Sequence, residues 1–361
     1  MKKAKVLIVD DAMLIRRLVS EAVTADPAIE VVGEAANGRI ALQKIAQLAP
    51  DLVTLDIEMP EMDGLTTLRA IRKTYPRLPV VMFSALTERG AADTLEALHI
   101  GASDYVTKPS STAGKSVAQQ RIAQDLVPKI RSLCRVGSSP SSSGVMQTAP
   151  GAPKPFTMRA LGTPTRADIV AIGVSTGGPN ALATVLSGLP ADFPAPIMLV
   201  QHMQNMFTRF LAERLNTQTA LNVVEAENGQ VVQPGTVYVA PGDFHLTVRR
   251  EANQIITVLG QEPPEHSHRP AADVLFHSVA EVYGSRALGL VLTGMGEDGR
   301  RGSEEINRAG GRVVVQDEAS SVVWEMAGRV ARAGLADSVV PLSALAGELV
   351  RRTGRPSTTA A

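Results

Sequence analysis

The first third of the chain alternates short apolar segments with longer segments whose apolar residues recur at helical spacing. The apolar segments that predict strands are residues 6–9, 29–33, 52–55, 80–83 and 104–107. Residues 14–23, 38–48 and 91–98 carry the helical pattern, with apolar side chains on one face. Five strands joined by crossover helices predict a doubly wound, flavodoxin-like parallel sheet.

A second series of apolar segments begins after residue 166. Residues 169–174, 196–201, 288–293 and 312–316 are mostly apolar runs, as expected of parallel strands that are buried on both faces. Residues 237–240, 245–248 and 254–259 alternate around turn residues and predict an antiparallel insertion, and residues 272–283 predict a helix. This half is expected to be a doubly wound, mostly parallel α/β domain with an antiparallel insertion.

The composition changes to serine, glycine and proline between the two series. Residues 126–133 have an amphipathic pattern that extends the preceding helix, and residues 136–165 have the composition of a flexible linker. We therefore expect a first domain over residues 1–123 and a helix end and linker over 124–165. A second domain is expected over residues 166–352, followed by a polar tail over 353–361.

Length and charge limit the possible functions. The chain has 361 residues, which favours two domains. Lysine plus arginine and aspartate plus glutamate balance at 36 each, which argues against a partner bound by charge alone, such as nucleic acid. The single cysteine excludes an internal disulfide framework, and we identify neither a signal peptide nor an apolar run that spans a bilayer. These features predict a cytoplasmic protein without direct membrane insertion.

Polar residues follow the strands of the first domain at one predicted edge of the sheet. Asp10 and Asp11 end the first strand and Asp56 ends the third, so a parallel sheet gathers three carboxylates where ligands bind in such folds. Mutual repulsion of these carboxylates is relieved by a hard cation with oxygen ligands, and Mg²⁺ fits best. Ser84 and Lys108 end the fourth and fifth strands and are placed to contact phosphoryl oxygens.

Three buried strands of the second domain lead to a serine, a histidine and an aspartate. Ser175 lies in a strand-to-helix corner between Gly173 and Gly177, with the spacing of a nucleophile elbow. His202 follows the next strand, and Asp298 lies in the loop after a third. Parallel strands bring these ends to one edge, where a nucleophile, a base and an orienting carboxylate can act together. Their order along the chain differs from that of α/β-hydrolases, which indicates serine-hydrolase chemistry on another topology.

A dinucleotide-binding loop is the competing interpretation of the glycine pattern from Gly294 to Gly299, and Asp317 lies near the expected position of a ribose-binding acid. Glu297 and Asp298 would repel a pyrophosphate there, and the chain remaining after the loop is too short for the two mononucleotide-binding halves of such a domain. The remaining histidines are expected to be packing or loop residues, and a catalytic zinc site is not expected. They are His99, His245, His266, His268 and His277.

The first domain resembles a two-component response-regulator receiver domain. The matching residues are Asp10, Asp11, Asp56 with Met59 and Pro60 after it, Ser84 with Ala85, Tyr105, and Lys108 with Pro109. The resemblance implies that Asp56 is phosphorylated and that Asp10, Asp11, Asp56 and the backbone carbonyl of Glu58 bind Mg²⁺. It further implies that Ser84, Tyr105 and Lys108 respond to the phosphoryl group, and that the bond before Pro109 is cis.

The whole chain resembles the chemotaxis protein-glutamate methylesterase family of the CheB type. The residues that carry this resemblance are 173–179, 201–203, 268–270, 273–276 and 293–299, behind the receiver domain. It implies that Ser175 is the nucleophile, His202 the general base and Asp298 the carboxylate that orients His202. It also implies that the Met295 amide belongs to the oxyanion hole, with Thr176 beside the nucleophile, and that the second domain needs no cofactor.

The implied function is phosphorylation-controlled demethylation of glutamyl methyl esters, with deamidation of glutamines, on chemoreceptors. A chemotaxis histidine kinase is the implied phosphodonor. Two other classes stay open from the sequence: a receiver-controlled signalling adaptor without catalysis, and a transcription factor, for which we find no helix-turn-helix and no basic face. The sequence does not specify the receptor, the glutamates that are modified or the oligomeric state.

Overall fold

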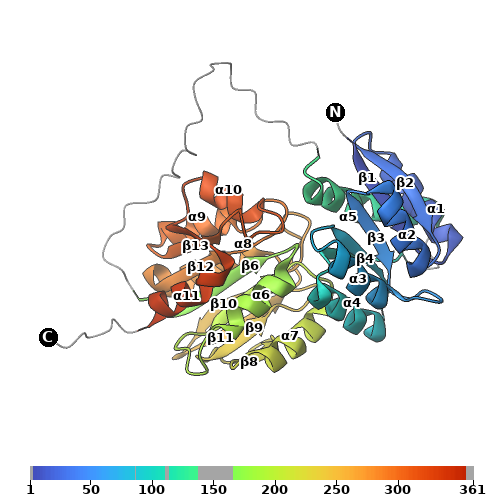
Figure 1. Ribbon diagram of the computed structural model, residues 1–361. Helices are drawn as coiled ribbons and strands as arrows, with labels where there is room; N and C mark the ends of the chain where they lie inside the picture. The colour runs from blue at the N-terminus through green and yellow to red at the C-terminus, as the bar shows by residue number, and fades with distance from the viewer. Residues whose placement is uncertain (1–2, 86, 110–113, 137–165, 355–361) are drawn as a thin grey trace, which may run out of the picture. The chain divides into compact units, whose positions relative to one another are not determined.

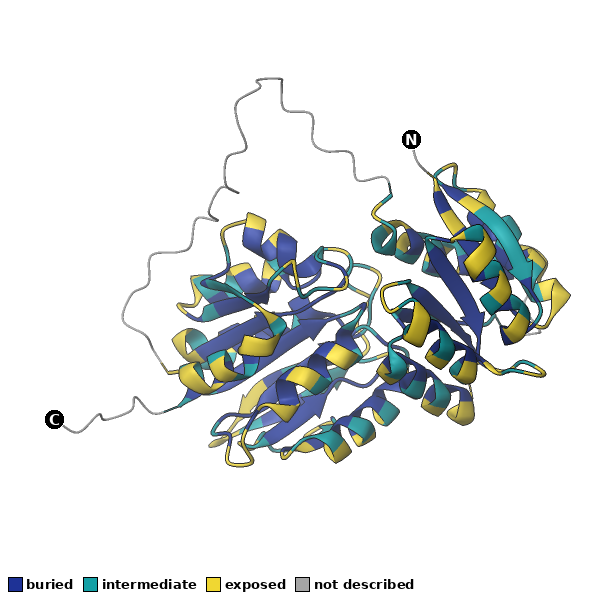
Figure 2. Cartoon of the chain, in the orientation of Figure 1, coloured by how far each residue is buried: buried dark blue, intermediate teal, exposed yellow. Residues whose placement is uncertain are grey.

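The computed structural model describes residues 3–85, 87–109, 114–136 and 166–354 (Figure 1). The chain divides into two compact units, Met1–Pro153 and Lys154–Ala361. Most of the expected linker and tail lie outside the described residues. Each unit has its own sheet, and the central strands of both sheets are buried, whereas the edge strands β2, β8 and β14 are partly exposed (Figure 2).

The first unit contains a five-stranded parallel sheet with the order β2-β1-β3-β4-β5. Its strands are β1 (Ala4–Val9), β2 (Ile29–Ala35), β3 (Leu52–Asp56), β4 (Val80–Ser84) and β5 (Asp104–Thr107). Its helices are α1 (Met13–Thr24), α2 (Gly38–Leu48), α3 (Gly64–Thr74), α4 (Glu88–Ile100) and α5 (Lys115–Leu133). Helix α1 packs with α5, while α2, α3 and α4 form a second group. This is the doubly wound, flavodoxin-like order that the sequence predicts.

Short polar residues begin three helices of the first unit. The side chains of Asn37, Asp63 and Thr87 accept hydrogen bonds from backbone amides in the first turns of α2, α3 and α4. Helix α3 also begins very close to the end of β3, since a β-carbon at Gly64 would lie 2.1 Å from the Asp56 carbonyl oxygen. The glycine therefore allows α3 to pack directly behind the loop that carries Asp56.

The second unit contains a seven-stranded sheet with the order β14-β13-β12-β6-β7-β9-β8, and all of its pairs are parallel. Its strands are β6 (Ile169–Val174), β7 (Ile197–Gln201), β8 (Asn222–Glu225), β9 (Thr236–Val239), β12 (Ala287–Val291), β13 (Arg312–Gln316) and β14 (Ser338–Val340). The chain starts at β6 in the middle, continues outward through β7, and returns to the other side of β6 with β12. The topological switch point therefore lies between β6 and β12, where ligands bind in doubly wound sheets.

Helices cover both faces of the second sheet. They are α6 (Gly178–Ser187), α7 (Phe207–Gln218), α8 (Ala272–Tyr283), α9 (Arg300–Arg308), α10 (Met326–Arg332) and α11 (Leu345–Thr353), with short 3₁₀ helices η1 (Gly284–Arg286) and η2 (Leu342–Ala344). Contacts group α6 with α7 and α11, and group α9 with α8 and α10. The hairpin formed by β10 (His245–Glu251) and β11 (Gln254–Gly260) is antiparallel and packs against α8.

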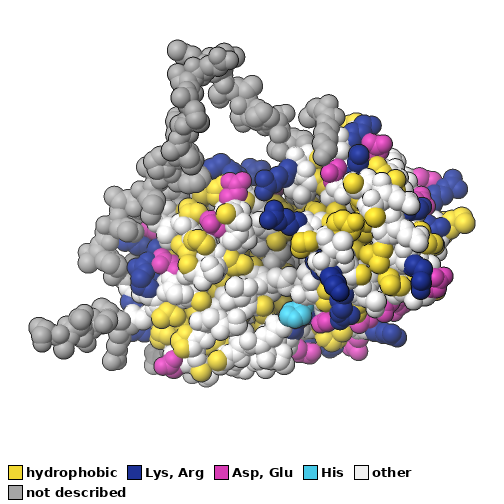
Figure 3. Space-filling view, in the orientation of Figure 1, with side chains coloured by type: hydrophobic (Ala, Val, Ile, Leu, Met, Phe, Trp, Pro, Cys, Tyr) yellow, Lys and Arg dark blue, Asp and Glu magenta, His cyan; other side chains and the backbone are white. Residues whose placement is uncertain are grey.

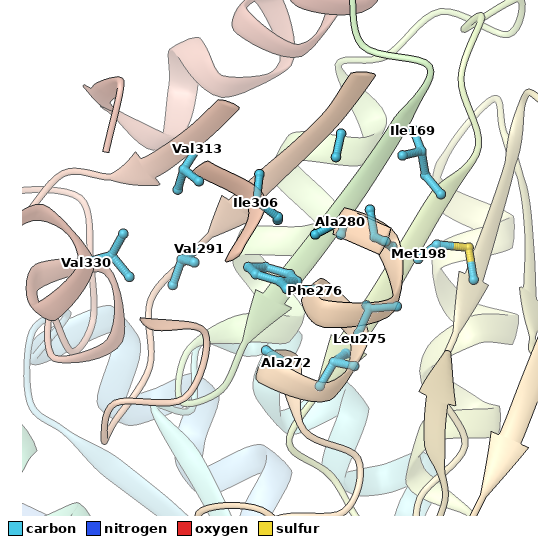
Figure 4. Close-up of a cluster of buried hydrophobic side chains, with 14 of the residues drawn as sticks. Ile169, Met198, Ala272, Leu275, Phe276, Ala280, Val291, Ile306, Val313 and Val330 are labelled. Carbon is cyan, nitrogen blue, oxygen red and sulfur yellow. The ribbon is translucent and has the colours of Figure 1, made fainter. Parts of the chain in front are cut away.

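Helix α8 is central to the core of the second unit. Phe276 is fully buried among residues from β6, β12 and β13 (Figure 4). Replacing such a buried phenylalanine by alanine costs about 3–5 kcal/mol in other proteins. A β-carbon at Gly173 would lie 2.6 Å from the Ala272 β-carbon, so the missing side chain lets the start of α8 approach β6 closely.

The structure corrects part of the predicted antiparallel insertion. Residues 237–240 were assigned to it, but β9 is a parallel strand of the main sheet and pairs with β7 and β8. All four residues of β9 are buried, so its side chains do not have the half-exposed environment that a two-stranded insertion would give. The antiparallel prediction is confirmed for β10 and β11. Strands β8 and β14 were not predicted, because they are short and only partly buried.

Charged side chains of both signs are mixed on the face of the molecule drawn in Figure 3, in keeping with the balanced composition. No helix among the described residues is both long enough and apolar enough to cross a membrane.

Candidate active site and acidic pocket

Ser175 lies at the corner between β6 and α6, at the carboxyl edge of the second sheet. Its amide donates to the Thr293 carbonyl at 3.0 Å, and its carbonyl accepts from the Gly178 amide at 2.8 Å. The corner needs Gly177, which has a φ of 79° at the start of α6. Gly294 lies directly against the serine, since a β-carbon there would be 2.8 Å from the Ser175 β-carbon. Backbone on both sides therefore fixes the half-buried Ser175.

Two buried polar side chains support this corner. The Gln201 Nε2 atom donates to the carbonyls of Ser175 and His202, at 3.1 and 3.3 Å. The Thr293 hydroxyl donates to the Thr176 carbonyl at 2.9 Å, and the Thr293 amide donates to the Gln316 side chain at 2.9 Å. The sequence contains a signal for these residues, because each polar residue ends an otherwise apolar strand. Neither Gln201 nor Thr293 is among the predicted site residues.

His202 and Asp298 form a buried pair. The distance from His202 Nε2 to Asp298 Oδ2 is 2.7 Å, and the two side chains are only 4% and 1% exposed. Asp298 also accepts hydrogen bonds from the amides of Ala272, Asp273 and Gly299, at 2.6, 2.8 and 2.9 Å. Burial alone would raise the pKa of Asp298, but His202 and the backbone amides outweigh this effect and lower the pKa to about 2. Asp298 is therefore a fixed anion.

The register of the sheet brings Ser175 and His202 to the same level. Val174 pairs with Gln201, and the His202 amide donates to the Val174 carbonyl at 3.1 Å. The His202 Nδ1 atom is buried and has no hydrogen-bond partner in the structure, so Ser175 and His202 are not hydrogen-bonded here. A buried imidazole nitrogen normally has a partner, and catalytic hydrogen bonds often tighten only when substrate binds.

Met295 and Thr176 lie in the two loops that meet at Ser175. Met295 is half-buried and follows Gly294 in the loop after β12, whereas Thr176 is 3% exposed and follows the serine directly. A second carboxylate, Asp273, lies behind Asp298. Burial and the charge of Asp298 raise the pKa of Asp273, against the effect of hydrogen bonds from Gly302 and His266.

Two histidines that we expected to be packing or loop residues lie at this site. His268 stacks on His202, with ring centroids 3.9 Å apart and an angle of 10° between the ring planes. The His266 Nε2 atom lies 2.9 Å from Asp273 Oδ2. Both are loop residues, as expected, but His268 contacts His202 and His266 contacts Asp273. Sequence spacing missed them because the contacts join separate loops.

Hydrogen bonds within the loop after β12 argue against a dinucleotide-binding site there. The Gly299 amide donates to the Asp298 side chain, and the Gly296 amide donates to Glu325 Oε2 at 3.0 Å. Amides that a pyrophosphate would use therefore already bind carboxylates of the protein. Asp317 accepts hydrogen bonds from Ser320 and stabilises the local turn.

The carboxyl edge of the first sheet carries the predicted acidic cluster. Carboxylate oxygens of Asp10, Asp11 and Asp56 lie within 4.8 Å of one another. The Lys108 Nζ atom lies 2.9 Å from Asp10 and 2.7 Å from Asp56. Burial and the charge of Asp10 raise the pKa of Asp56 to about 6, against the opposing effect of Lys108.

Other predicted residues of the first unit lie around the same pocket. Glu58, Ser84 and Lys108 line it together with Asp11 and Asp56. Ser84 is fully buried, and its hydroxyl donates to the Gly90 carbonyl at 3.0 Å. Tyr105 is half-buried on β5, with Lys129 Nζ 6.0 Å from its ring centre. Tyr105 is not among the residues that line the pocket.

The expectation of a cis bond before Pro109 is wrong. Among the described residues the cis peptide bond is Arg269–Pro270, and Lys108–Pro109 is trans. The trans form is the favoured isomer of an X–Pro bond. Ion pairs with Asp10 and Asp56 and a 2.7 Å hydrogen bond from the Lys108 amide to the Ser84 carbonyl already fix Lys108.

The acidic cluster matches the donors that Mg²⁺ prefers. Its three ligands are carboxylates, and the buried Oδ2 atoms of Asp10 and Asp56 share the single ammonium group of Lys108. Hard cations bind such oxygens, whereas the pocket offers neither sulfur nor imidazole. The residues present therefore fit a magnesium site.

Comparison with known proteins relates both units to described families. Residues 170–349 match the CheB methylesterase family model, and residues 6–115 match the response regulator receiver domain. A protein-glutamate methylesterase/protein-glutamine glutaminase of Trichodesmium erythraeum is 48% identical over 354 residues, covering 98% of this chain and 100% of the relative. A relative of the same name from Nocardioides sp. is 51% identical, covering 97% of this chain and 96% of the relative. The solved Thermotoga maritima CheB methylesterase catalytic domain has 41% identity and a TM-score of 0.51, covering 52% of this chain and 99% of that structure.

Proposed function

Because the chain belongs to the CheB methylesterase family, we propose that Ser175, His202 and Asp298 are its catalytic triad. The chain is a protein-glutamate methylesterase/protein-glutamine glutaminase that a receiver domain regulates in chemotaxis adaptation. The observation that carries the triad assignment is the His202–Asp298 hydrogen bond, which leaves the buried Nδ1 atom at the level of Ser175.

In the proposed reaction, Ser175 Oγ attacks the carbonyl carbon of a glutamyl γ-methyl ester. His202 Nδ1 takes the serine proton, and Asp298 stabilises the imidazolium through Nε2. The tetrahedral intermediate expels methanol, which leaves with the proton from His202. Water then enters with His202 as base, and the acyl-serine is hydrolysed to glutamate. A glutamine substrate follows the same steps and releases ammonia.

The oxyanion hole is proposed to include the Met295 backbone amide, with Thr176 supporting the corner beside the nucleophile. Gly294 and Ser175 are in close contact, so the next amide in that loop is near the atom under attack. Preorganised amides of this kind each contribute roughly 10²–10³ in turnover in serine hydrolases.

We place the regulatory phosphorylation on Asp56. Asp10, Asp11, Asp56 and the Glu58 carbonyl would hold Mg²⁺, which neutralises the charge on a transferring phosphoryl group. Lys108 is next to Asp56 and would bind a phosphoryl oxygen through its ammonium group. Ser84 and Tyr105 would then change conformation, and Ser84 would exchange its bond to the Gly90 carbonyl for one to the phosphoryl group.

The response-regulator family implies a kinase as phosphodonor and chemoreceptors as substrates. We propose a chemotaxis histidine kinase and the methylated glutamates on cytoplasmic helices of the receptors, so the site of action is the cytoplasm. Proposed functional boundaries are residues 1–123 for the receiver and 166–352 for the catalytic domain.

Methanol release from methylated receptors tests the proposal. Ser175→Ala is expected to reduce turnover roughly 10⁴-fold or more. Ser187→Ala is the matched control, because this exposed hydroxyl on α6 lies away from the catalytic edge. A Ser175→Ala protein that releases methanol at the parental rate would contradict the triad and favour the adaptor alternative.

The regulatory part of the proposal has its own variant in the same assay. Addition of a small-molecule phosphodonor with Mg²⁺ should stimulate the parent, and Asp56→Asn should abolish stimulation and phosphoryl labelling while basal turnover persists. Labelling that survives in Asp56→Asn would place the phosphoacceptor elsewhere.

A further inference from the structure

The turn over residues 265–268 brings a second imidazole to the proposed triad. Glu265 and His268 exchange backbone hydrogen bonds of 3.0 and 2.8 Å, so only His266 and Ser267 form the tip. These two residues have φ values of 50° and 66°. The left-handed region is uncommon for residues other than glycine, and such conformations concentrate at functional sites. This unusual turn places His266 beside Asp273 and His268 against His202.

His268 lies face to face with His202. The ring centroids are 3.9 Å apart, and the planes differ by 10°. Asp298 holds His202 only at Nε2, while Nδ1 has no partner. A ring held at one edge atom can still tilt about that bond and carry Nδ1 away from the serine corner. A flat ring packed over its face opposes this tilt.

We propose that His268 is a positioning residue for the reaction, with its ring face keeping the His202 plane aligned so that Nδ1 points to Ser175. This inference rests on the proposed function of Ser175 and His202. It assigns no proton transfer to His268. It predicts that the aromatic face of residue 268 matters and that its ring nitrogens do not.

Positioning by stacking has a defined kinetic signature. Misplacing a catalytic group by about 1 Å can lower turnover roughly 10²-fold without weakening substrate binding. His268→Ala should therefore reduce kcat roughly 10–100-fold and leave KM within about threefold. His268→Phe keeps a flat face without a titratable nitrogen and should restore kcat to within about fivefold of the parent.

The experiment compares these variants in the full-length protein by methanol release from methylated receptors. His277→Ala is the matched control, because this imidazole is exposed on α8 and pairs with Glu305 rather than with the triad. It should have parental kcat and KM. Circular dichroism and thermal unfolding of each variant establish that the proteins compared are folded. If His268→Ala is not folded, His268→Gln replaces it with the same expectations, since it also lacks an aromatic face.

Several outcomes would overturn the inference. Parental kcat in the folded His268→Ala protein would exclude positioning by this ring. A His268→Phe protein as slow as His268→Ala would show that a ring nitrogen, and not the face, is required. A large rise in KM with unchanged kcat would assign His268 to substrate binding. If Ser175→Ala is inactive, the proposed triad still holds and only the inference on His268 fails. If Ser175→Ala is active, the proposed triad itself is contradicted.

Discussion

The two parallel sheets of this protein place aspartates at equivalent edges but give them opposite acidities. Asp56 at the end of β3 has its pKa raised to about 6, whereas the pKa of Asp298 beyond β12 is lowered to about 2. Both carboxylates are at least 98% buried, so burial does not distinguish them. The sheet topology delivers a carboxylate to the edge, and the neighbouring groups decide its charge.

The neighbours differ in kind. Asp298 accepts hydrogen bonds from three backbone amides and contacts His202, and each of these contacts stabilises the ionised carboxylate. Asp56 and Asp10 share the ammonium group of Lys108, so Asp56 gains only part of its attraction. The negative charge of Asp10 also lies beside Asp56 and repels its ionised form. Asp298 is therefore suited to orient an imidazole permanently. Asp56 lies in a crowded acidic pocket that a cation would relieve.

Asp298→Asn should have the largest effect of the changes that test this comparison. An amide cannot stabilise the His202 imidazolium as an anion does, and its NH₂ group would face backbone donors. We expect kcat to fall roughly 10⁴-fold in methanol release, as when the equivalent acid is neutralised in other serine hydrolases. Asp168→Asn, which alters a carboxylate paired with Arg286 at the opposite end of β6, is the control. Near-parental turnover in Asp298→Asn would contradict the proposal that the Asp298 carboxylate orients His202.

The pH dependence of the esterase sharpens the contrast. Because the pKa of Asp298 is about 2, this carboxylate stays ionised above pH about 4 and should not limit catalysis on the acid side, which leaves a single proton to do so. We expect kcat/KM to fall about tenfold per pH unit there. A limb of about a hundredfold per unit would indicate a second group that must also lose a proton.

The acidic pocket should show the smallest effect, and this effect is on stability. The first unit should lose stability as the pH rises, whereas the esterase should lose activity as the pH falls. Folding raises the pKa of Asp56 from 3.8 to about 6, so this group favours the folded state at low pH, and the contribution is lost as pH rises through 6. In a chelator, the melting temperature of the first unit should fall by a few degrees between pH 5 and 7.5. Mg²⁺ should restore it by binding the folded state.

Asp56→Asn is the control for this measurement, since it removes the titrating group. The pH dependence should flatten and the response to Mg²⁺ should weaken. An unchanged response to Mg²⁺ in this variant would mean that the cation binds at another site.

Strand ends were the part of the site most accessible from sequence. Apolar runs ending before Ser175 and His202 predicted their shared edge, and the resemblance to the CheB family is confirmed. The hydrogen bond through His202 Nε2 was not predictable, because it depends on the amides of Ala272 and Asp273 at the start of α8. That helix lies close to β6 only after folding.

One other miss comes from a contact between separate loops, and two come from a strand direction and a proline isomer that the sequence does not specify. The stacking of His268 on His202 needs the turn at residues 265–268, which no hydrophobic period specifies. Strand β9 was assigned to the wrong kind of pairing, because a four-residue apolar segment carries no information on its direction. The isomer of the Lys108–Pro109 bond likewise depends on local contacts and was predicted wrongly.

The switch point between β6 and β12 also sets the order in which a growing polypeptide acquires its chemistry. The serine and the imidazole leave the ribosome early, but their carboxylate follows almost a hundred residues later, after the β10–β11 hairpin and α8. A nascent or truncated product that stops before β12 therefore holds the proposed nucleophile and base without the proposed orienting carboxylate. On the proposed mechanism, such a fragment should release no methanol from methylated receptors.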